Sequence, residues 1–576
     1  MSQTDFLPLL TADVIRWERI LITVAGRASN IADGSVDFYL SNENGERLKL
    51  TDAIVSDGRF AVRFNIVTVY TDRTCLPDGR WELLAVSKDT AAVFPVIAGE
   101  KLFSDVGRDD HFVGLPREEK LARYGCTFAK SSSNAYSLIP AVMSGDRLCF
   151  DSLYAHPLPL SMPQHIMRSL KKVFGPLVNA ILRGGFFIIY DLTKLLTAHK
   201  GNHVLFCSDS REELSGNLEF VYRRMVERRL DKQFKISFLF KKNVRARRSF
   251  GEKFRAPFAL ARADIILIDD FNPTIAQLKF KRGVKVIQLW HACGAFKTVG
   301  FSRLGKQGGP AINSRNHRAY THAIASSRHV APFYCEAFGL TPDMVYPTGV
   351  PRTDIFFDEK YRSETRAALY ELVPQAKGKR VILFAPTFRG NGAKSGNYPL
   401  FKLDMNALAQ LCRETNSVFI FKMHPFVHDK VVIRPEFSDC LIDLSAEREI
   451  NDLLFITDLL ITDYSSVVYE ASLLNIPMLF FAWDLEAYIS TRDFYEPFES
   501  FVPGKIVRTF DELVKAIVNE DYEQEKVLPF CKRNFEFRDG HSTDRVIDWL
   551  LLGQEGEYSK RRDEAEPSPA AEQSNG

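Results

Sequence analysis

The stretch ITDYSSVVYEASLLNIPMLFF, residues 461–481, joins two apolar runs through a short polar turn and a segment whose apolar residues recur at helical spacing. An apolar strand, a helix and a second apolar strand in this order predict a βαβ unit with parallel strands. We expect a strand over 457–462 and a helix over 466–474. Ser465 and Ser466 would then lie at the helix N-terminus, beside the carboxyl end of a buried strand.

The two adjacent serines have two interpretations, and the segment alone leaves both open. Serine is among the best N-cap residues, so the pair could simply end the helix. The same position offers unpaired backbone N–H groups, the positive end of the helix dipole and two hydroxyl groups, which together suit a phosphate.

The alternation of apolar strands and helices extends over the whole chain from residue 201. The strand-like runs are HVLFCS, KISFLF, DIILIDD and KVIQLWH, and then RVILFAPT, SVFIFKMHP, DLLITD and PMLFF. They predict an α/β protein with two doubly wound parallel-sheet domains, over 201–360 and 361–552, the second binding a nucleotide. Ligands of such sheets bind beyond the carboxyl ends of the strands, so we expect the site in a cleft between the domains.

The remaining segments have different patterns. Residues 1–158 contain alternating apolar runs separated by DG, NG and PDG turns, which predict an all-β accessory domain. Residues 159–200 form a helical linker, in which 162–183 is amphipathic and basic, with a kink expected at Pro176. This helix suits either a membrane interface or packing on a neighbouring domain. The polar tail 553–576 is expected to be disordered.

Composition excludes several classes of protein. The 576 residues are 45% apolar and 26% charged with a net charge of +3, which argues against a dedicated nucleic-acid-binding protein. Nine cysteines without a CxxC pair indicate neither a zinc ribbon nor a disulfide framework. No signal peptide or membrane span is recognised, so a cytoplasmic location is expected.

Polar residues follow the apolar strands in four further segments. LWHACGAFK contains His291, and FKMHP contains His424. FAPTFRGN supplies Thr387 and Arg389, and PTGVPRTD supplies Arg352 and Asp354. His424 and His428 have the spacing of a metal pair, but Pro425 disfavours the helix that such a pair needs, so we reject a metal site. The absence of GxxxxGK[ST] and GxGxxG disfavours a nucleoside triphosphatase or a dehydrogenase.

These motifs also carry a family resemblance. LWHACGAFK, GVPRTD, APTFR, KMHP, DYSS and WDLEAYISTRDFY resemble, in this order, the motifs of the CDP-glycerol glycerophosphotransferase family, over about 201–550. The resemblance implies a GT-B fold, in which two Rossmann-like domains enclose the active site. It also implies an enzyme of teichoic-acid or capsule synthesis that is peripheral on the inner face of the cell membrane. The interfacial interpretation of 162–183 is thereby favoured.

The resemblance implies a reaction. The donor would be a CDP-polyol, with CDP-glycerol as the first expectation. A hydroxyl of a lipid-linked or polymeric acceptor would attack the phosphorus next to the polyol, and CMP would leave. No cofactor or nucleic acid is implied, and a metal is not required, because a helix N-terminus and arginine can supply the positive charge otherwise brought by magnesium.

Roles follow for residues that match the family's motifs. His291 would accept the hydroxyl proton, and His424 would hydrogen-bond the transferring phosphate or the leaving oxygen. The expected phosphate-binding residues are Thr387, Arg389, Ser465 and Ser466. The expected nucleotide-binding residues are Pro386, Asp463 and Glu470, the last of these at the ribose. Further candidates are Lys297, Arg352, Asp354 and Arg492.

The chain departs from the family's motifs at two points. One more residue separates His291 from Lys297 than in the commoner WHGTPLK, and Asp493 replaces the usual glycine of RGFY. The β domain lies outside the recognised resemblance. Two alternative functions stay open: a GT-B glycosyltransferase that uses a sugar nucleotide, and a catalytically silent protein that binds an anionic polymer.

Overall fold

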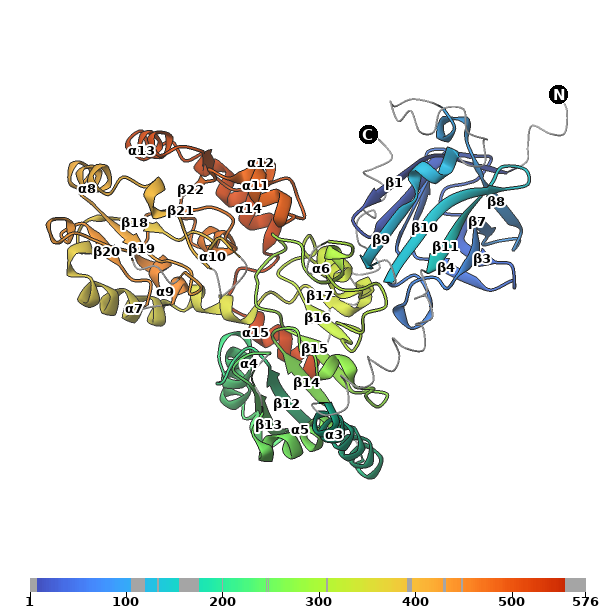
Figure 1. Ribbon diagram of the computed structural model, residues 1–576, viewed down its shortest axis with the longest axis horizontal. Coiled ribbons are helices and arrows are strands. Elements are labelled where there is room, and N and C mark those ends of the chain that lie inside the picture. Colours follow the sequence, from blue (N-terminus) through green and yellow to red (C-terminus); the bar gives the residue numbers. More distant parts are fainter. Residues whose placement is uncertain are drawn as a thin grey trace, which may run out of the picture.

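The protein consists of a β-rich N-terminal part followed by two α/β parts, each built on a parallel sheet (Figure 1). The computed structural model describes residues 8–104, 120–131, 134–154, 176–198, 200–244, 246, 248–306, 309–390, 396–427, 431–446 and 449–554. The predicted α/β class and the predicted β-rich N-terminal region are both confirmed.

The β-rich part is a largely antiparallel sheet of eleven strands within the described residues. Its backbone order is β4-β3-β7-β11-β8-β1-β2-β6-β5, and β10 and β9 continue from β11. Alternate side chains of these strands, such as Phe38 and Leu40 of β3, point into one apolar core. The strands are β1 Leu9–Glu18, β2 Leu21–Ser29, β3 Val36–Asn42, β4 Arg47–Leu50, β5 Asp52–Ser56, β6 Arg59–Asn65, β7 Gly79–Ser87, β8 Val93–Ala98, β9 Cys126–Ser131, β10 Asn134–Met143 and β11 Arg147–Tyr154.

The first α/β part contains a six-stranded parallel sheet in the order β13-β12-β14-β15-β16-β17. Every residue of its central strand β14 is buried, as expected for a sheet covered on both faces. The elements are α3 Pro176–Leu196, β12 His203–Ser208, α4 Gly216–Glu227, β13 Lys235–Phe240, α5 Phe250–Arg262, β14 Ile265–Ile268, β15 Lys285–Gln288, β16 His322–Ile324, α6 Ala331–Phe338 and β17 Val345–Tyr346.

The second α/β part has a six-stranded parallel sheet in the order β20-β19-β18-β21-β22-β23. The order reverses between β18 and β21, and the loops that leave these strands diverge there, which makes this edge the usual ligand site of such sheets. The elements are α7 Glu359–Leu372, β18 Arg380–Phe384, α8 Met405–Glu414, β19 Ser417–Phe421, β20 Leu441–Asp443, α9 Ile450–Leu453, β21 Leu459–Thr462, α10 Val467–Leu473, β22 Met478–Phe481, α11 Leu485–Thr491, α12 Phe498–Phe501, β23 Lys505–Val507, α13 Phe510–Val518, α14 Val527–Asn534 and α15 Ser542–Arg545. The strand and the helix predicted around ITDYSS are therefore present as β21 and α10.

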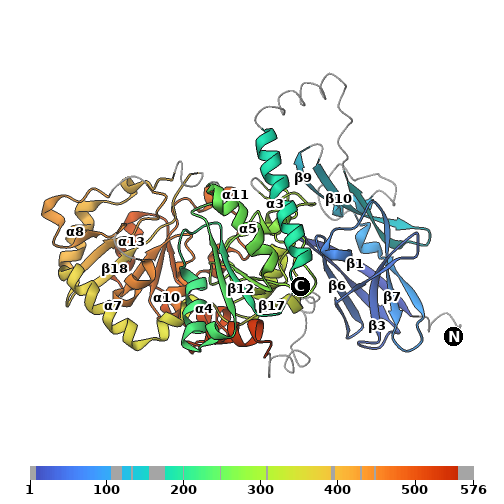
Figure 2. The same ribbon diagram turned by 90° about the horizontal axis from the view of Figure 1, so that it is seen from below.

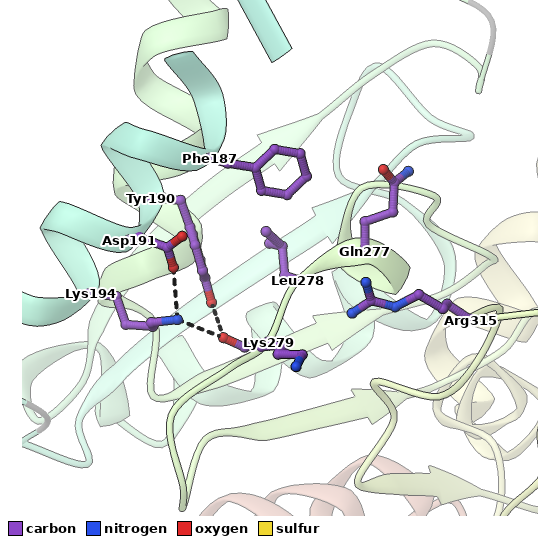
Figure 3. Close-up of a pocket in the computed structure, with 8 residues that line it drawn as sticks. All are labelled: Phe187, Tyr190, Asp191, Lys194, Gln277, Leu278, Lys279 and Arg315. Carbon is purple, nitrogen blue, oxygen red and sulfur yellow. Dashed lines mark hydrogen bonds and ion pairs between the residues drawn. The ribbon is translucent and has the colours of Figure 1, made fainter. Parts of the chain in front are cut away.

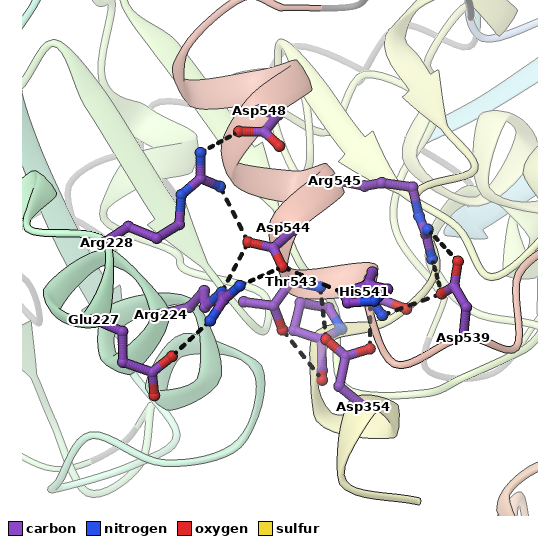
Figure 4. Close-up of polar contacts among 12 residues, drawn as sticks. Arg224, Glu227, Arg228, Asp354, Asp539, His541, Thr543, Asp544, Arg545 and Asp548 are labelled. Atoms are coloured by element: carbon purple, nitrogen blue, oxygen red, sulfur yellow. Dashed lines mark hydrogen bonds and ion pairs between the residues drawn. The ribbon is translucent and has the colours of Figure 1, made fainter. Parts of the chain in front are cut away.

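The C-terminal segment returns to the first α/β part. Asp544, in α15, pairs with Arg224 of α4, and Asp548 pairs with Arg228 (Figure 4). The Asp354 carboxylate accepts hydrogen bonds from the backbone N–H groups of the first two residues of α15, at 2.9 and 2.8 Å. Asp354, a candidate site residue, thus anchors the returning helix, and residues 542–551 pack on the part of the chain that precedes the predicted boundary at 360.

Arg19, at the turn between β1 and β2, joins the β-rich part to both α/β parts. Its Nε and Nη2 donate to the two carboxylate oxygens of Glu336 in α6, at 2.7 and 2.9 Å, and its Nη1 donates to the carbonyl of Tyr495. Burial raises the pKa of Glu336, and the hydrogen bonds from Arg19 oppose that effect. Phe301 and Leu304, which follow His291 in the chain, are buried in the core of the β-rich part.

Two sequence predictions fall partly or wholly outside the described residues. Of the amphipathic segment 162–183, only the portion from Pro176 is described, so the kink expected at Pro176 lies at the edge of the described residues. Helix α3 packs on α5 at the outside of the first α/β part (Figure 2). Residues 555–576, most of the tail predicted to be disordered, lie outside the described residues.

Removing Arg19 tests this junction. Arg19→Ala leaves the Glu336 carboxylate, which is 1% exposed, without its cation, so we expect a loss of about 3 kcal/mol in the free energy of unfolding. The loss should be smaller at pH 5 than at pH 8. Burial raises the pKa of Glu336 in the folded protein, so the folded state binds a proton more readily than the unfolded chain does. The free energy of unfolding therefore falls as pH rises, and it falls most in the variant, where no arginine stabilises the ionised carboxylate.

Urea unfolding at both pH values measures the effect. The matched control is Arg80→Ala, which removes a bidentate pair with Asp151 inside the β-rich part, where the two side chains are 40% and 29% exposed. That loss should be about 1 kcal/mol or less. Equal losses in the two variants would contradict the structural role of Arg19.

Candidate functional site

His291 lies just past the carboxyl end of β15 in the first α/β part. The residue before it, Trp290, has a φ of 50°, in the left-handed region that bulky side chains rarely adopt. The Gln288 side chain accepts a hydrogen bond from the Trp290 N–H, and the indole lies against the imidazole with ring centroids 4.2 Å apart. Such backbone strain is commonly found at functional sites, and here it lies directly before His291.

A backbone carbonyl fixes the protonation pattern of His291. Its Nδ1 lies 3.3 Å from the carbonyl oxygen of Asp269, which can only accept, so Nδ1 carries the hydrogen and Nε2 carries the lone pair. The Asp270 carboxylate lies 4.0 Å from the same Nδ1. The side chain is 46% exposed. This imidazole is therefore set up to accept a proton at Nε2.

His424, past the carboxyl end of β19 in the second α/β part, has the opposite pattern. The N–H of Phe426 donates to its Nδ1 at 3.1 Å, so the neutral ring carries its hydrogen on Nε2. The ring lies between Phe388 and Phe426, with centroids 4.7 and 4.8 Å away. Burial lowers the pKa of His424, and the nearby Lys297 lowers it further. The residue is therefore a neutral hydrogen-bond donor at Nε2.

Asp463 and Arg389 form a buried network at the edge between β18 and β21. The Asp463 carboxylate is fully buried, accepts the N–H of Thr387 at 2.7 Å and lies 3.0 Å from a guanidinium nitrogen of Arg389. The same guanidinium donates twice to Asp484, at 2.6 and 2.9 Å. Asp463 and Arg389 thus hold the two loops together. Direct contact of either residue with a nucleotide or a phosphate stays a prediction.

Thr387 and the serines lie at the same edge. The Thr387 hydroxyl is buried and has no hydrogen-bond partner among the described residues, so a ligand could occupy that position. Ser465 is half-buried and accepts a hydrogen bond from the Val467 N–H at 3.4 Å. Ser466 occupies the N-cap position of α10, where it is exposed and makes no capping bond. Pro386 is buried next to Thr387.

A second ion pair, with a buried carboxylate and a partly exposed guanidinium, joins the two α/β parts. Arg352 donates to Oε1 of Glu470 in α10, and the thiol of Cys293, from the loop after His291, donates to the same oxygen at 3.2 Å. The other carboxylate oxygen of Glu470 and Nε of Arg352 have no hydrogen-bond partner in the described structure. The predicted contact of Glu470 with a ribose is untested, and half of its carboxylate already serves the junction.

Lys297 brings positive charge next to His424, and Arg492 lies near Lys297. Lys297 forms an isolated β-bridge with Phe494, and its ammonium lies 5.3 Å from the ring centroid of Tyr488. Burial lowers the pKa of Lys297 to about 8; Asp463 opposes this effect, and Arg492 and Arg389 add to it. Arg492 is exposed. Groups of three or more His, Cys, Asp or Glu side chains that could hold a metal ion do not occur among the described residues.

Several residues of the site were not predicted. Asp269 and Asp270 orient His291, Asp484 pairs with Arg389, and Phe388 and Phe426 enclose His424. The two aspartates end the apolar run DIILIDD, so the rule that polar residues at strand ends gather at one sheet edge could have indicated them. The phenylalanines have no such signal, because apolar residues near strands are common.

Comparison with known proteins adds to this geometry. The sequence profile of the CDP-Glycerol:Poly(glycerophosphate) glycerophosphotransferase family matches residues 189–552. The teichoic acid ribitol-phosphate polymerase TarL of Staphylococcus aureus (strain NCTC 8325 / PS 47) is 43% identical over 558 residues, 93% of this chain and 98% of TarL. TarK of the same strain, also a teichoic acid ribitol-phosphate polymerase, is 52% identical over 366 residues, 64% of this chain and 71% of TarK.

Solved structures of the wall teichoic acid polymerase TagF share the fold. One of them has a TM-score of 0.54 and 22% identity, and the match covers 69% of this chain and 99% of TagF. The GT-B-like character of the α/β parts is thereby supported. The family profile begins after the β-rich part, as the resemblance implied, whereas the match to TarL is long enough to include most of that part. The chain belongs to the CDP-glycerol:poly(glycerophosphate) glycerophosphotransferase family.

Proposed function

We propose that this protein transfers a polyol phosphate from a CDP-activated donor to a hydroxyl group of a growing, lipid-linked teichoic-acid polymer and releases CMP. We further propose that the polyol is ribitol. The sequence motifs led to glycerol as the first expectation, whereas the relatives TarL and TarK, which are 43% and 52% identical, are ribitol-phosphate polymerases. The two α/β parts would act as the Rossmann-like halves of a GT-B enzyme, with the donor between them.

The observation that carries the proposal is the opposite protonation pattern of the two histidines. Transfer of a phosphoryl group requires a nucleophile that loses a proton and a phosphate whose oxygens are held. His291, with its lone pair on Nε2, would take the proton of the acceptor hydroxyl as its oxygen attacks the phosphorus next to the polyol. His424, with its hydrogen on Nε2, would donate a hydrogen bond to a phosphate oxygen.

The remaining groups of the site fit the rest of the reaction. The bond between the attacked phosphorus and the bridging oxygen breaks, and CMP leaves with the electron pair. The Thr387 hydroxyl, Ser465 and Ser466, at the edge between β18 and β21, would bind phosphate oxygens of the leaving nucleotide. Lys297 would neutralise charge close to His424. Arg389 would keep these loops in place through Asp463 and Asp484.

Donor choice tests the proposal. The assay is chromatographic detection of the released nucleotide, with a ribitol-phosphate oligomer as acceptor and CDP-ribitol, CDP-glycerol, UDP-glucose or GDP-mannose as donor. We expect acceptor-dependent CMP release, fastest with CDP-ribitol. Release of a nucleoside diphosphate would instead indicate a glycosyltransferase, and no turnover with any donor would favour the polymer-binding alternative.

Substitution by glutamine should affect the two histidines differently in the same assay. Glutamine keeps an N–H donor but cannot act as a base at neutral pH. His291→Ala and His291→Gln should therefore both lose about 10³-fold in kcat, the usual range for a general base. His424→Gln should keep more activity than His424→Ala. His541→Ala, with a side chain 64% exposed, is the control and should stay near wild type. Equal rescue by glutamine at both positions would contradict the assigned roles.

Binding of CDP should weaken at alkaline pH through Lys297. Because the pKa of Lys297 is lowered to about 8, the ammonium loses its charge as pH rises through 8, and the affinity for CDP should fall by up to about tenfold per pH unit above that value. Lys297→Arg stays charged and should bind CDP with little change between pH 7 and 9. Calorimetric titration at several pH values measures both. Identical pH profiles would show that Lys297 does not face the nucleotide.

The resemblance favoured membrane contact by segment 162–183, and we propose that helix α3, which overlaps this segment and extends beyond it, makes such a contact. None of the described helices is long and apolar enough to cross a lipid bilayer. The exposed face of α3 nevertheless carries Ile188, Leu192 and Leu195, which are 61%, 54% and 78% exposed. A pocket of about 330 Å³ lies beside this helix, and Lys194, Lys279 and Arg315 line it (Figure 3). Apolar and basic groups together suit an anionic membrane surface.

Negative charge introduced on the exposed face of α3 should abolish binding to an anionic membrane. We expect the double variant Leu192→Asp/Leu195→Asp to stay in the supernatant when wild type sediments with vesicles that contain phosphatidylglycerol. The control Val432→Asp changes a valine that is 78% exposed in the second α/β part, and it should sediment like wild type. Sedimentation of the double variant with the vesicles would contradict the role of α3.

A further inference from the structure

Four cationic side chains lie along two neighbouring segments, one from each α/β part. Lys297, Arg303 and Lys306 belong to the segment after His291, and Arg492 precedes Asp493 in the RDFY motif. The segments are aligned by hydrogen bonds: the N–H of residue 298 donates to the carbonyl of Asp493 at 2.9 Å, and Lys297 forms a β-bridge with residue 494. The ammonium of Lys306 lies 3.3 Å from the Asp493 carboxylate. We name these four cations the cationic row.

The cationic row holds more positive than negative charge. Arg492 lies close enough to Lys297 and Arg303 to lower the pKa of both, in addition to the larger effect of burial. The carboxylates that oppose this repulsion are Asp463 at Lys297 and Asp493 at Arg303 and Lys306. Asp463 is already paired with Arg389. Crowded like charges are unfavourable in a folded protein, and an anion that bridges them would relieve the repulsion.

The row runs from His424 towards solvent. Lys297, at one end, lies close enough to His424 to affect its pKa, and Lys306, at the other, has a side chain 61% exposed. The segment between them is fixed, because Phe301 and Leu304 on either side of Arg303 are buried in the core of the β-rich part. The β-rich part thereby determines where Arg303 and Lys306 lie.

We propose that Arg492, Arg303 and Lys306 of the cationic row bind consecutive phosphodiester groups of the acceptor polymer, so that the terminal hydroxyl is presented to His291, while Lys297 serves the donor. This inference rests on the proposed function, which makes the acceptor a polyanion with one charge per polyol unit. The two phosphates of a CDP-linked donor have their own groups at the edge between β18 and β21, so they do not require a row that extends to Lys306. Both departures from the family's motifs, the longer loop after His291 and Asp493, adjoin the row.

Binding of a labelled oligomer without donor tests the row. The probe is a fluorescent ribitol-phosphate oligomer of eight units, titrated with the full chain and followed by anisotropy. The double variant Arg303→Gln/Lys306→Gln should bind it about tenfold more weakly at low salt, with a smaller difference at high salt because salt screens the charges. CDP affinity should stay as in wild type. Lys360→Gln, which removes a lysine 84% exposed on α7, is the control.

A second variant should bind the oligomer more tightly than wild type, a result that loss of folding could not produce. Asp493→Asn removes the carboxylate next to Arg303 and Lys306 but keeps the backbone carbonyl that bonds to residue 298, so it should tighten oligomer binding. Oligomer affinity unchanged in both variants, or CDP affinity reduced as much as oligomer affinity, would overturn the proposal. Oligomer binding by a wild type that turns over no CDP-polyol would refute the proposed function and leave the cationic row standing.

Discussion

One ion pair, Arg352 with Glu470, ties the two α/β parts together next to the proposed site; its carboxylate is buried, and its guanidinium is 25% exposed. Arg352 follows the last strand of the first sheet, and Glu470 lies in the helix after β21 of the second. Cys293, two residues after His291, donates its thiol to the same carboxylate. Breaking such a pair by removing one partner commonly costs about 3–5 kcal/mol, since the other charge stays buried. The loop of the proposed base is thereby tied to the helix that begins at the two serines.

Backbone hydrogen bonds then give two chemically equal side chains unequal roles. A carbonyl next to Nδ1 makes His291 an acceptor at Nε2, and an N–H next to Nδ1 makes His424 a donor there. Protonation of His424 at Nδ1 would break the hydrogen bond that this nitrogen accepts from the Phe426 N–H. This agrees with the lowered pKa of the ring. The two roles that we propose in phosphoryl transfer would thus follow from where two loops leave two strands, and neither requires an unusual residue.

The sequence predicted the parts of the site that follow from periodicity. The βα alternation placed His291, Thr387, His424 and Ser465 past strand ends, and the strands and helices bear this out. The βα alternation could not predict which polar side chains form ion pairs or hydrogen bonds with one another. Arg389 is engaged by Asp463 and Asp484, and Asp354 caps a helix about 190 residues away. These partners are distant in sequence, and pairing at such distances leaves no periodic pattern.

The docking of the β-rich part escaped prediction for the same reason. Nothing in the turn that contains Arg19 indicates that it reaches Glu336 and Tyr495, because a single arginine in a β-turn is ordinary. No sequence pattern indicates that Phe301 and Leu304 are buried in the core of the β-rich part. Together these contacts make the β-rich part a support for the loop after His291, where the alternation of strands alone suggested a separate accessory unit.

The central claim, that the backbone holds the two histidines in opposite tautomers, can be measured by ¹⁵N NMR of histidine-labelled protein near pH 8. Spectra of His291→Gln and His424→Gln assign the two rings by difference. We predict a neutral His291 with its hydrogen on Nδ1 and a neutral His424 with its hydrogen on Nε2. The same tautomer in both rings, or a doubly protonated His424 at this pH, would contradict the account.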